Sequence, residues 1–292
     1  MQDQSGEFER HRPRLFGIAY RMLGSRTDAE DVLQDAYLRW HRGAPGGLRS
    51  PEAWLVTTVT RLCIDRLRVA RTERELYVGP WLPEPLIGDA APAADARAEL
   101  ASSLSIAFLV VLEQLEPDER AAFLLHEVFD TDYAEIAEIL GKSEAACRQI
   151  VSRARKRVRG QRPRAEVSNA ARRSVLERFA NAIQTQDKAA LLKLVAEKAS
   201  WTSDGGGRTR AALKVIRGRE RLTRFALAVL GRHADRLAFE MTSVNGEPAL
   251  MIRAEGKLFA VMTVRTDGLR ILDVFTVLNP DKLAATAVPA HD

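Results

Sequence analysis

The segment from Tyr133 to Arg159 contains two helical patterns separated by Gly-Lys-Ser, and this break constrains the fold more than any other feature of the sequence. In the first pattern, apolar residues recur at the i, i+3, i+4 and i+7 spacing of one helix face. Gly141 has the permissive backbone that ends a helix, and Ser143 is a good N-cap for the next one. Two helices joined by a short turn that contains glycine predict a helix-turn-helix.

The second helix of this motif carries different side chains on its two faces. The inward, apolar residues are Cys147, Ile150, Val151, Ala154 and Val158. The outward, polar residues are Arg148, Gln149, Ser152, Arg153 and Lys156. From Lys142 to Arg164 there are nine Lys or Arg and one acidic residue. A solvated face usually mixes both signs of charge, whereas a phosphate-binding face does not. The outward residues are therefore our candidate DNA-binding surface, which would enter the major groove.

The whole chain sets broader limits. Its 292 residues predict about two domains, and its 46% hydrophobic content is ample for packed cores. Its net charge of +5 comes from clustered basic residues, which indicates a polyanionic partner. The two cysteines, Cys63 and Cys147, fall on helix stripes, so we expect reduced core residues and neither a metal site nor a cofactor. No apolar run approaches roughly 18 residues and no signal peptide begins the sequence, so we expect a cytoplasmic protein with no membrane contact.

Residues 8–75 predict a first helical module. One apolar stripe contains Phe8, Leu15, Ile18, Ala19 and Met22. Thr27 is the expected N-cap of a second helix, which has an acidic face made of Asp28, Glu30, Asp31 and Asp35. A loop rich in glycine follows, and a third helix begins at Pro51 and becomes basic toward its end.

Residues 76–98 form a Pro-rich linker with an unusual Trp81, and we expect part of it to dock on another surface. Residues 99–163 form a second helical module, which ends in the helix-turn-helix, and a basic segment at 159–164 is a predicted hinge. The chain is therefore multidomain, with two all-α modules before the hinge.

Residues 169–284 have a different pattern. Helices are expected near 170–186, 187–197 and 218–232, and four strands follow. The turn dipeptides between the strands are Asn245-Gly246, Glu255-Gly256 and Asp267-Gly268, which favour antiparallel hairpins. Helices followed by such a meander predict an α+β cone, with the helices on one face of a curved sheet.

The order of these pieces resembles a known family. The stretches that carry the resemblance are DAEDVLQDAYLRW (28–40), SPEAWLVTTVTRLCIDRLR (50–68), LEPDERAAFLL (115–125) and YAEIAEILGKSEAACRQIVSRARKRVR (133–159). They resemble the extracytoplasmic-function sigma factors of bacterial RNA polymerase, over residues 8 to about 160. The remainder resembles the SnoaL-like, nuclear-transport-factor-type cone domain. The resemblance implies that core RNA polymerase and promoter DNA are the partners, and that residues 8–75 and 99–163 are sigma domains 2 and 4.

The resemblance also assigns roles to residues. Polymerase docking would use the acidic second helix, through Asp28, Glu30, Asp31, Val32 and Asp35. The −10 element would be held as single-stranded DNA by Arg49, Ser50, Arg61, Asp65, Arg66 and Arg68. The −35 element would be read by the outward residues of the helix-turn-helix, with Arg155, Arg157 and Arg159 as candidate phosphate contacts.

Three short stretches resemble the sigma subgroup that carries a fused cone: WLPEP (81–85), DGGGR (204–208) and NPDKL (279–283). The subgroup usually has Lys after the glycines, and this chain has Arg208, which keeps the charge. We expect these stretches to meet and to make the cone a built-in regulator. The candidate regulatory contacts are Trp81, Leu82, Pro83, Asp204, Gly205, Gly206, Gly207, Arg208, Asn279, Pro280, Asp281 and Lys282.

Two other function classes share some of these features. A one-component regulator would combine the helix-turn-helix with a cone that senses a small molecule. An isomerase or cyclase fused to a DNA-binding module would need two titratable groups that converge inside the cone, and the candidates are Asp204, His233 and Asp273. No sequence pairing demands such a constellation, and the three glycines lack the spacing of a phosphate-binding loop. We therefore expect no catalytic residues, and a pocket that could hold a ligand.

Overall fold

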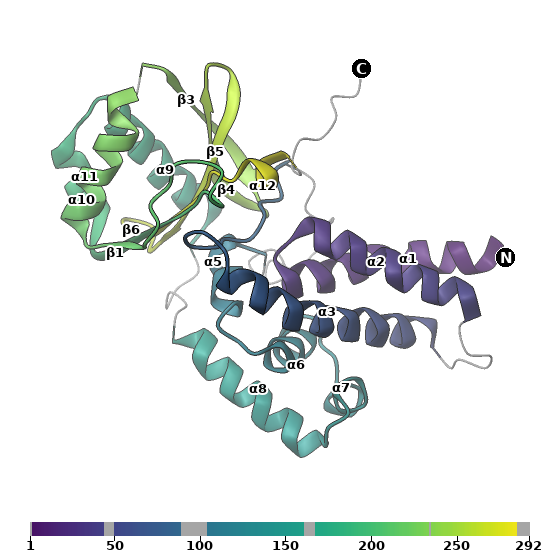
Figure 1. Cartoon of the computed structure of the whole chain (residues 1–292). Coiled ribbons are helices and arrows are strands. Elements are labelled where there is room, and N and C mark those ends of the chain that lie inside the picture. The colour runs from purple at the N-terminus through teal and green to yellow at the C-terminus, as the bar shows by residue number, and fades with distance from the viewer. Residues whose placement is uncertain (1, 44–49, 89–103, 161–166, 234, 285–292) are drawn as a thin grey trace. The chain divides into compact units, whose positions relative to one another are not determined.

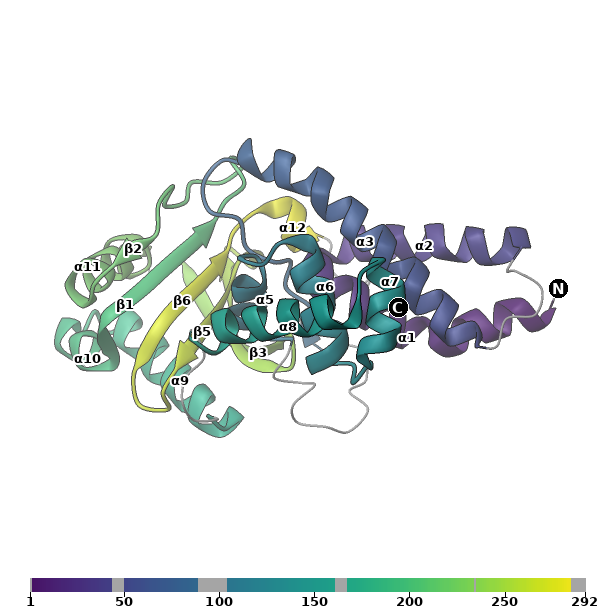
Figure 2. The same cartoon turned by 90° about the horizontal axis from the view of Figure 1, so that it is seen from below.

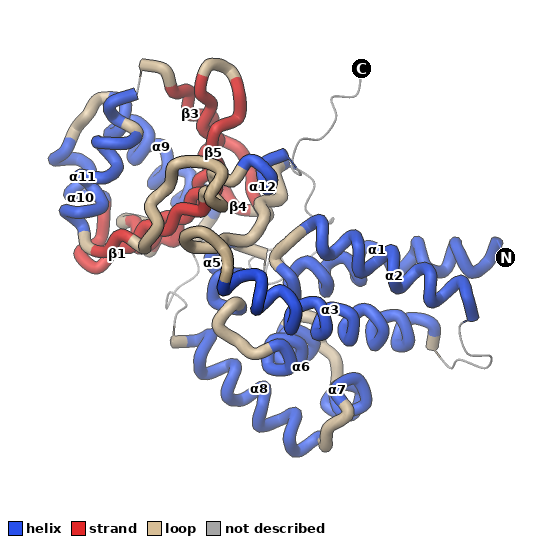
Figure 3. Tube along the Cα trace, in the orientation of Figure 1, coloured by secondary structure: helices blue, strands red, loops and turns tan. Residues whose placement is uncertain are grey.

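The computed structural model describes residues 2–43, 50–88, 104–160, 167–233 and 235–284. These residues form two compact units (Figure 1). The first unit contains residues 2–75 and 108–160, and the second contains residues 76–88, 104–107 and 167–284. Among the described residues, the first unit is entirely helical, and all strands lie in the second unit (Figure 3).

Three helices begin the first unit: α1 (Gln2–Leu23), α2 (Arg26–Gly43) and α3 (Pro51–Glu75). The predicted apolar stripe on α1 is confirmed, because all five of its residues are buried. The predicted cap of α2 is wrong by two residues. The helix starts at Arg26, and the Ser25 hydroxyl accepts the Asp28 N–H at 3.1 Å, so Ser25 takes the capping role that we expected for Thr27.

The helix-turn-helix also lies in the first unit, after α5 (Ile106–Leu112) and α6 (Pro117–Glu127). Its helices are α7 (Tyr133–Leu140) and α8 (Glu144–Arg159). Gly141 adopts φ 63°, the left-handed conformation that ends α7. The Ser143 hydroxyl accepts the Ala146 N–H at 3.2 Å and so caps α8, as the sequence predicts.

Within this unit, α6 packs on α1 and α3. The buried guanidinium of Arg120, on α6, bonds the end of α1. It donates hydrogen bonds to the Met22 carbonyl at 2.6 Å and to the Glu113 carboxylate at 2.8 Å. Burial lowers the pKa of Arg120 to about 9, which is the electrostatic cost of placing this cation in the packed interior.

The second unit contains one six-stranded sheet with the strand order β2-β1-β6-β5-β4-β3. The strands are β1 (Val195–Asp204), β2 (Ile216–Arg217), β3 (Leu237–Val244), β4 (Glu247–Ala254), β5 (Lys257–Thr266) and β6 (Ile271–Val277). The last four form the predicted antiparallel meander. Strands β1 and β6 are neighbours and run parallel, as Figure 2 shows.

The helices of this unit are α9 (Asn169–Gln184), α10 (Lys188–Leu194), α11 (Arg219–Val229), the short η2 (Gly231–His233) and α12 (Pro280–Ala284). Helix α9 packs on β4 and β5, whereas α10 and α11 pack on β1 (Figure 1). The sequence predicts a helix up to residue 197, but α10 ends at Leu194 and β1 begins at Val195. The expected α+β cone is therefore present, and its sheet contains β1 and β2 in addition to the four strands of the meander.

Two-residue turns connect the meander at its first two corners. Asn245 and Gly246 have φ values of 55° and 79°, and Glu255 and Gly256 have 51° and 78°. Positive φ at both central positions matches the twist of the flanking strands, so these pairs make the predicted hairpins. The third predicted corner, at Gly268, also has positive φ (92°).

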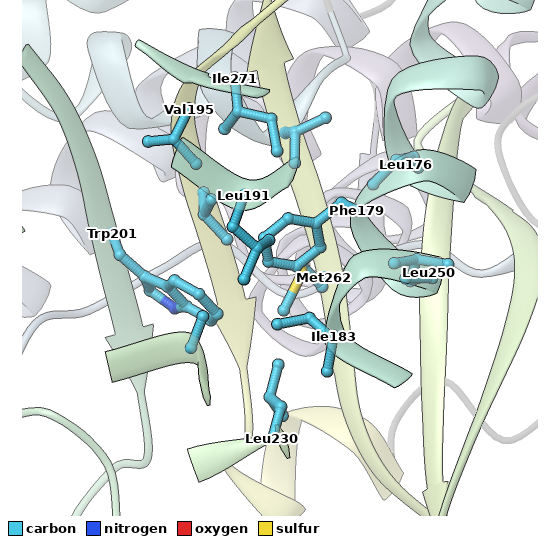
Figure 4. Packing of buried hydrophobic residues seen from close by; sticks show 14 of the residues in the cluster. Leu176, Phe179, Ile183, Leu191, Val195, Trp201, Leu230, Leu250, Met262 and Ile271 are labelled. Atoms are coloured by element: carbon cyan, nitrogen blue, oxygen red, sulfur yellow. The ribbon is translucent and has the colours of Figure 1, made fainter. Parts of the chain in front are cut away.

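The core of the second unit lies between the helices and one face of the sheet. Phe179 and Ile183 of α9, Leu191 of α10 and Leu230 meet Trp201 and Met262 of the sheet (Figure 4). This single apolar cluster fixes the sheet relative to its helices within the unit.

In the described part of the chain, no helix is both long and apolar enough to cross a membrane. The His, Cys, Asp and Glu side chains of this part form no group of three or more that could hold a metal ion. Cys63 and Cys147 are buried free thiols, as expected.

Candidate nucleic-acid interface and linker contacts

Helix α8 presents its predicted outward face to solvent. Its five inward residues are buried, so the side chains of the candidate DNA-binding surface are exposed on the other side. Arg148 donates to the Glu144 carboxylate at 2.5 Å, and its guanidinium lies 5.2 Å from the centre of the Tyr133 ring. These contacts hold Arg148 near the start of the helix, where a residue that reads bases is expected.

Two other arginines of α8 have structural partners. Arg155 forms an ion pair with Glu127, and Arg157 lies 2.6 Å from the Glu119 carboxylate. Both glutamates belong to α6, so these pairs join α8 to the rest of its module. Within the described chain, no ion pair engages Lys156, which makes it a better candidate for a phosphate contact than Arg157.

The α3 side chains that we expected to hold the −10 element are engaged within the first unit. Arg61 donates to the carbonyl groups of Glu138 and Ile139, at 2.9 and 3.0 Å. These carbonyls lie at the C-terminal end of α7, where unpaired backbone oxygens attract a cation. Arg61 therefore ties α3 to the first helix of the helix-turn-helix.

The remaining −10 candidates have different surroundings. Arg66 pairs with Asp28 at 2.9 Å, and Arg68 pairs with Asp65 at 3.2 Å. Ser50 is exposed, and its hydroxyl accepts the N–H of Ala53 at 3.2 Å, so it caps α3. Arg49 lies outside the described residues.

The acidic face of α2 is partly available. Asp31 and Asp35 are exposed. Asp28 pairs with Arg66, and Glu30 pairs with Arg12 at 2.5 Å. Val32 is only 6% exposed, because the helical period turns it toward the core between the helices. Val32 therefore offers little apolar surface in this structure, and its role in polymerase docking stays a prediction.

The second unit brings the three fused-cone stretches together around Asp204. This side chain is 0% exposed. Its carboxylate accepts hydrogen bonds from the Tyr77 hydroxyl at 2.6 Å, the Leu82 N–H at 2.8 Å and the Lys282 ammonium at 2.7 Å. We call these four residues, with Trp81 and Asn279, the linker clasp.

Lys282 also contacts the linker directly. Its ammonium also donates to the Leu82 carbonyl at 2.5 Å, and it lies 4.1 Å from the centre of the Trp81 ring. A cation over an aromatic face is attracted by the ring's negative face. Pro83 is buried beside Leu82, while Arg208 and Asp281 form an exposed ion pair at 3.3 Å. Pro280 begins α12, which carries Lys282.

The three glycines allow this close approach. A Cβ on Gly205 would lie 2.4 Å from the Thr209 carbonyl oxygen, and one on Gly206 would lie 2.3 Å from the Asn279 amide nitrogen. Gly206 and Gly207 also have φ values of 58° and 72°. Bulk and conformation both therefore require glycine at the centre of this segment.

Two residues of the linker contacts were missed from the sequence. The Tyr77 hydroxyl bonds Asp204 and accepts from the Asn279 amide at 2.9 Å, and burial together with the Asp204 hydrogen bond raises the pKa of Tyr77. Asn245 accepts the Leu86 N–H at 2.8 Å and donates to the Leu104 carbonyl at 2.7 Å. The sequence identified Asn245 only as a turn residue, and no signal marked its side chain as a ligand of the linker.

Two of the three titratable candidates for catalysis, Asp204 and Asp273, make hydrogen bonds to different partners. Asp204 belongs to the clasp, while Asp273 accepts hydrogen bonds from Ser200 and Arg265 on neighbouring strands. The side chain of His233 lies outside the described residues. The two aspartates are therefore each engaged in a separate network.

Comparison with known proteins gives the same arrangement of modules. Residues 8–73 match Sigma-70 region 2, and residues 105–158 match Sigma-70, region 4. The chain is 38% identical to the ECF RNA polymerase sigma factor SigJ of Mycobacterium tuberculosis, over 96% of this chain and 93% of the relative. It is 29% identical to the probable ECF RNA polymerase sigma factor SigI of the same species, over 96% of this chain and 94% of that protein.

A solved structure is also similar over nearly the whole length. The crystal structure of the Mycobacterium tuberculosis extracytoplasmic function sigma factor SigJ matches with a TM-score of 0.78 and 33% identity, covering 97% of this chain and 99% of that one. With the two Sigma-70 regions, the helix-turn-helix and this full-length relative in agreement, the chain belongs to the extracytoplasmic-function sigma factors, which direct RNA polymerase to start transcription.

Proposed function

We propose that promoter recognition is divided between α8, which reads the −35 element, and α3 with its preceding loop, which holds the −10 element. The observation that carries this proposal is the exposed, polar and basic face of α8 on a well-capped helix. Arg148 and Arg153 carry the planar donors that suit guanine, Gln149 carries the amide that suits adenine, and Lys156 carries a charge that suits phosphate. Asp31 and Asp35 offer exposed negative charge for docking on core polymerase.

On this proposal, α3 must leave α7 before it can hold DNA. Arg61 cannot donate to the Glu138 and Ile139 carbonyls and to a phosphate in the same geometry, since its donors already point at those carbonyls. Binding to core polymerase would supply the free energy for this exchange, because it separates the two DNA-reading modules. The free protein is then a closed form and the holoenzyme an open one.

We also infer that the C-terminal domain regulates this opening through the linker clasp. The linker at 76–98 joins the two DNA-reading modules, and the clasp holds its first part against Asp204 and Lys282. A chain segment spans at most about 3.3–3.6 Å per residue, so residues fixed by the clasp no longer contribute to the reach between the modules. The clasp would therefore limit which spacings between the −35 and −10 elements the protein can span.

The test is in vitro transcription with core polymerase on promoters whose −35 to −10 spacing is varied. The full chain should start transcripts at one spacing, and Lys282→Met, which opens the clasp, should broaden the permitted spacings. Asp281→Asn, which alters an exposed ion pair beside the clasp, is the matched control. The same spacing preference in all three proteins, at equal binding to core polymerase, would contradict the regulatory role.

A one-component regulator is separated from this proposal by a simpler measurement. A sigma factor binds core polymerase in the absence of DNA, and charge reversal at Asp31 and Asp35 should weaken that binding. If the protein binds DNA tightly on its own and never binds core polymerase, the one-component reading is the correct one. An enzymatic role for the C-terminal domain has no specific observation in its favour, because Asp204 and Asp273 are engaged in separate networks.

A further inference from the structure

The second unit contains a cavity of about 640 Å³ between α11 and the sheet. Its walls are mostly apolar and include Trp201, Phe225, Leu230, Ile252 and Phe259. The Trp201 and Phe225 rings meet edge to face at 5.2 Å, and Figure 4 shows Trp201 at the border of the packed core. A cavity of this size and composition suits a small organic molecule with about two rings.

Two buried polar atoms, each on a residue that lines this cavity, have no hydrogen-bond partner among the described residues. They are the indole Nε1 of Trp201 and the hydroxyl of Thr276, whose residues are 2% and 4% exposed. Thr276 lies opposite Ser203 in the register of β1 and β6, and Trp201 precedes Ser203 by two positions on the same face. A buried indole N–H is a donor only, and it gains from an acceptor in the cavity.

The rest of the lining carries more positive than negative charge. Arg210 and Arg236 are exposed residues of the lining, and Glu255 is the one carboxylate among the described lining residues. Two guanidinium groups near an apolar cavity favour an organic anion over a neutral or cationic molecule. The described lining offers no aspartate or histidine as a second group for proton transfer, so the arrangement fits binding rather than catalysis.

We infer that this cavity binds an aromatic or alicyclic organic acid, whose rings contact Trp201, Phe225 and Phe259 and whose acceptor oxygen receives the Trp201 N–H. Thr276 and Ser203 supply hydroxyl groups beside the indole, and Arg210 or Arg236 attracts the anion. The ligand thus supplies the hydrogen-bond acceptor that the indole N–H lacks among the described residues.

The position of this site gives the bound acid a route to the clasp. Ser203 lines the cavity and directly precedes Asp204, and the N–H of Leu278, another lining residue, donates to the Asp204 carbonyl at 2.7 Å. A ligand that displaces either lining residue would move the backbone of the clasp. This second step rests on the proposed regulation, whereas binding in the cavity does not.

Binding is tested by isothermal titration of the full-length protein with 2-naphthoate as the probe. We expect saturable binding of one molecule per chain, and weaker binding of 2-methylnaphthalene, which has the same rings but no acceptor. Trp201→Phe keeps an aromatic ring and removes the N–H, so it should weaken naphthoate binding at least about fivefold. Trp54→Phe, in the first unit, should leave the affinity unchanged.

The anionic group has its own matched pair of variants. Arg210→Gln should weaken naphthoate binding by roughly two- to fivefold, as expected for an exposed ion pair, and should leave methylnaphthalene binding unchanged. Arg224→Gln, on the same unit but not in the cavity wall, should have no effect. Ala228→Trp fills the cavity from an exposed position on α11 and should abolish binding without loss of the fold, which circular dichroism checks.

Absence of saturable naphthoate binding to a folded full-length protein would overturn the inference. Binding that Trp201→Phe and Ala228→Trp both leave unchanged would also overturn it, since the probe would then occupy another place. The transcription assay is read separately. Naphthoate that binds in the cavity but leaves promoter spacing unchanged refutes the route to the clasp and keeps the site. A protein that binds naphthoate but fails to direct transcription refutes the proposed function alone.

Discussion

The ammonium of Lys282 lies 2.7 Å from the carboxylate of Asp204, and both side chains are buried, at 6% and 0% exposure. The pair connects α12 to the end of β1, and it bonds both the N–H and the carbonyl of Leu82. Removal of one partner of a buried ion pair strongly destabilises a protein, because the other charge then stays in the interior without compensation.

We therefore expect Lys282→Met to destabilise the second unit by about 3–5 kcal/mol. Urea unfolding measures the loss, and hydrogen exchange of residues 77–87 should show lower protection of the Leu82 amide. The double variant Asp204→Asn with Lys282→Met removes both charges and should recover part of the stability. Asp281→Asn should cost at most about 1 kcal/mol, because its pair with Arg208 is exposed. A loss in the single variant no larger than in this control would show that the pair is not needed.

The glycine at 206 gives an independent test of the clasp. Gly206→Ala places a Cβ where the Asn279 amide nitrogen would be 2.3 Å away, and it strains a φ of 58°. Gly246→Ala has similar strain, at φ 79°, but its Cβ would meet nothing within 4 Å. Left-handed strain costs about 1–2 kcal/mol in both variants, and the clash adds roughly 1–3 kcal/mol to Gly206→Ala alone.

Differential unfolding of the two variants in urea isolates the clash. Equal losses would mean that Asn279 moves away without cost. In that case the glycine would serve only the backbone conformation, and the clasp would tolerate a wider approach between its two halves.

Local patterns in the sequence were enough for most of the secondary structure. Gly141, Ser143 and the stripe on α8 identified the helix-turn-helix, because each acts through neighbours a few residues away. The hairpin turn at Asn245-Gly246 was equally local. The boundary at Val195 does not follow from local sequence. There, the pairing of β1 with the distant β6 replaces the last predicted turn of α10 with strand.

The linker contacts, like the secondary structure, could be predicted only in part. The resemblance alone predicts that WLPEP, DGGGR and NPDKL form one group. It did not identify Tyr77 or the Asn245 side chain, since their partners lie more than a hundred residues away and no spacing rule connects them. The burial of Val32 follows from its helical phase, which turns it toward the core although acidic residues surround it in the sequence.

Glu247 provides a pH-dependent test of the packing between α9 and β4. Burial raises the pKa of Glu247, although Arg172 lies 3.2 Å away. The folded protein therefore holds this proton at pH values where the unfolded chain has lost it, and stability falls as pH rises from the unfolded pKa of about 4.3 through the raised folded pKa. Glu247→Gln imitates the protonated form and should remove this part of the pH dependence.

The measurement is the free energy of unfolding of both proteins from pH 4 to pH 8. We expect the two to be similar at the acidic end, and the variant to become the more stable of the two as pH rises. A variant that becomes less stable than the parent toward pH 8 would show that the charged pair with Arg172 outweighs burial.

The last prediction concerns how α8 reads DNA. Arg148 is held at the start of the helix by Glu144 and Tyr133, and a bidentate contact to guanine is the natural use of its planar donors. Arg148→Ala should cost roughly 1–3 kcal/mol at one base position and relax the preference there. Lys156→Ala should weaken binding evenly across sequences and reduce the salt slope by about 1. Holoenzyme binding to a set of single-base promoter variants at several salt concentrations separates the two effects. If both substitutions cause the same loss at every base position, Arg148 contacts phosphate and the assignment of base reading to the start of α8 is wrong.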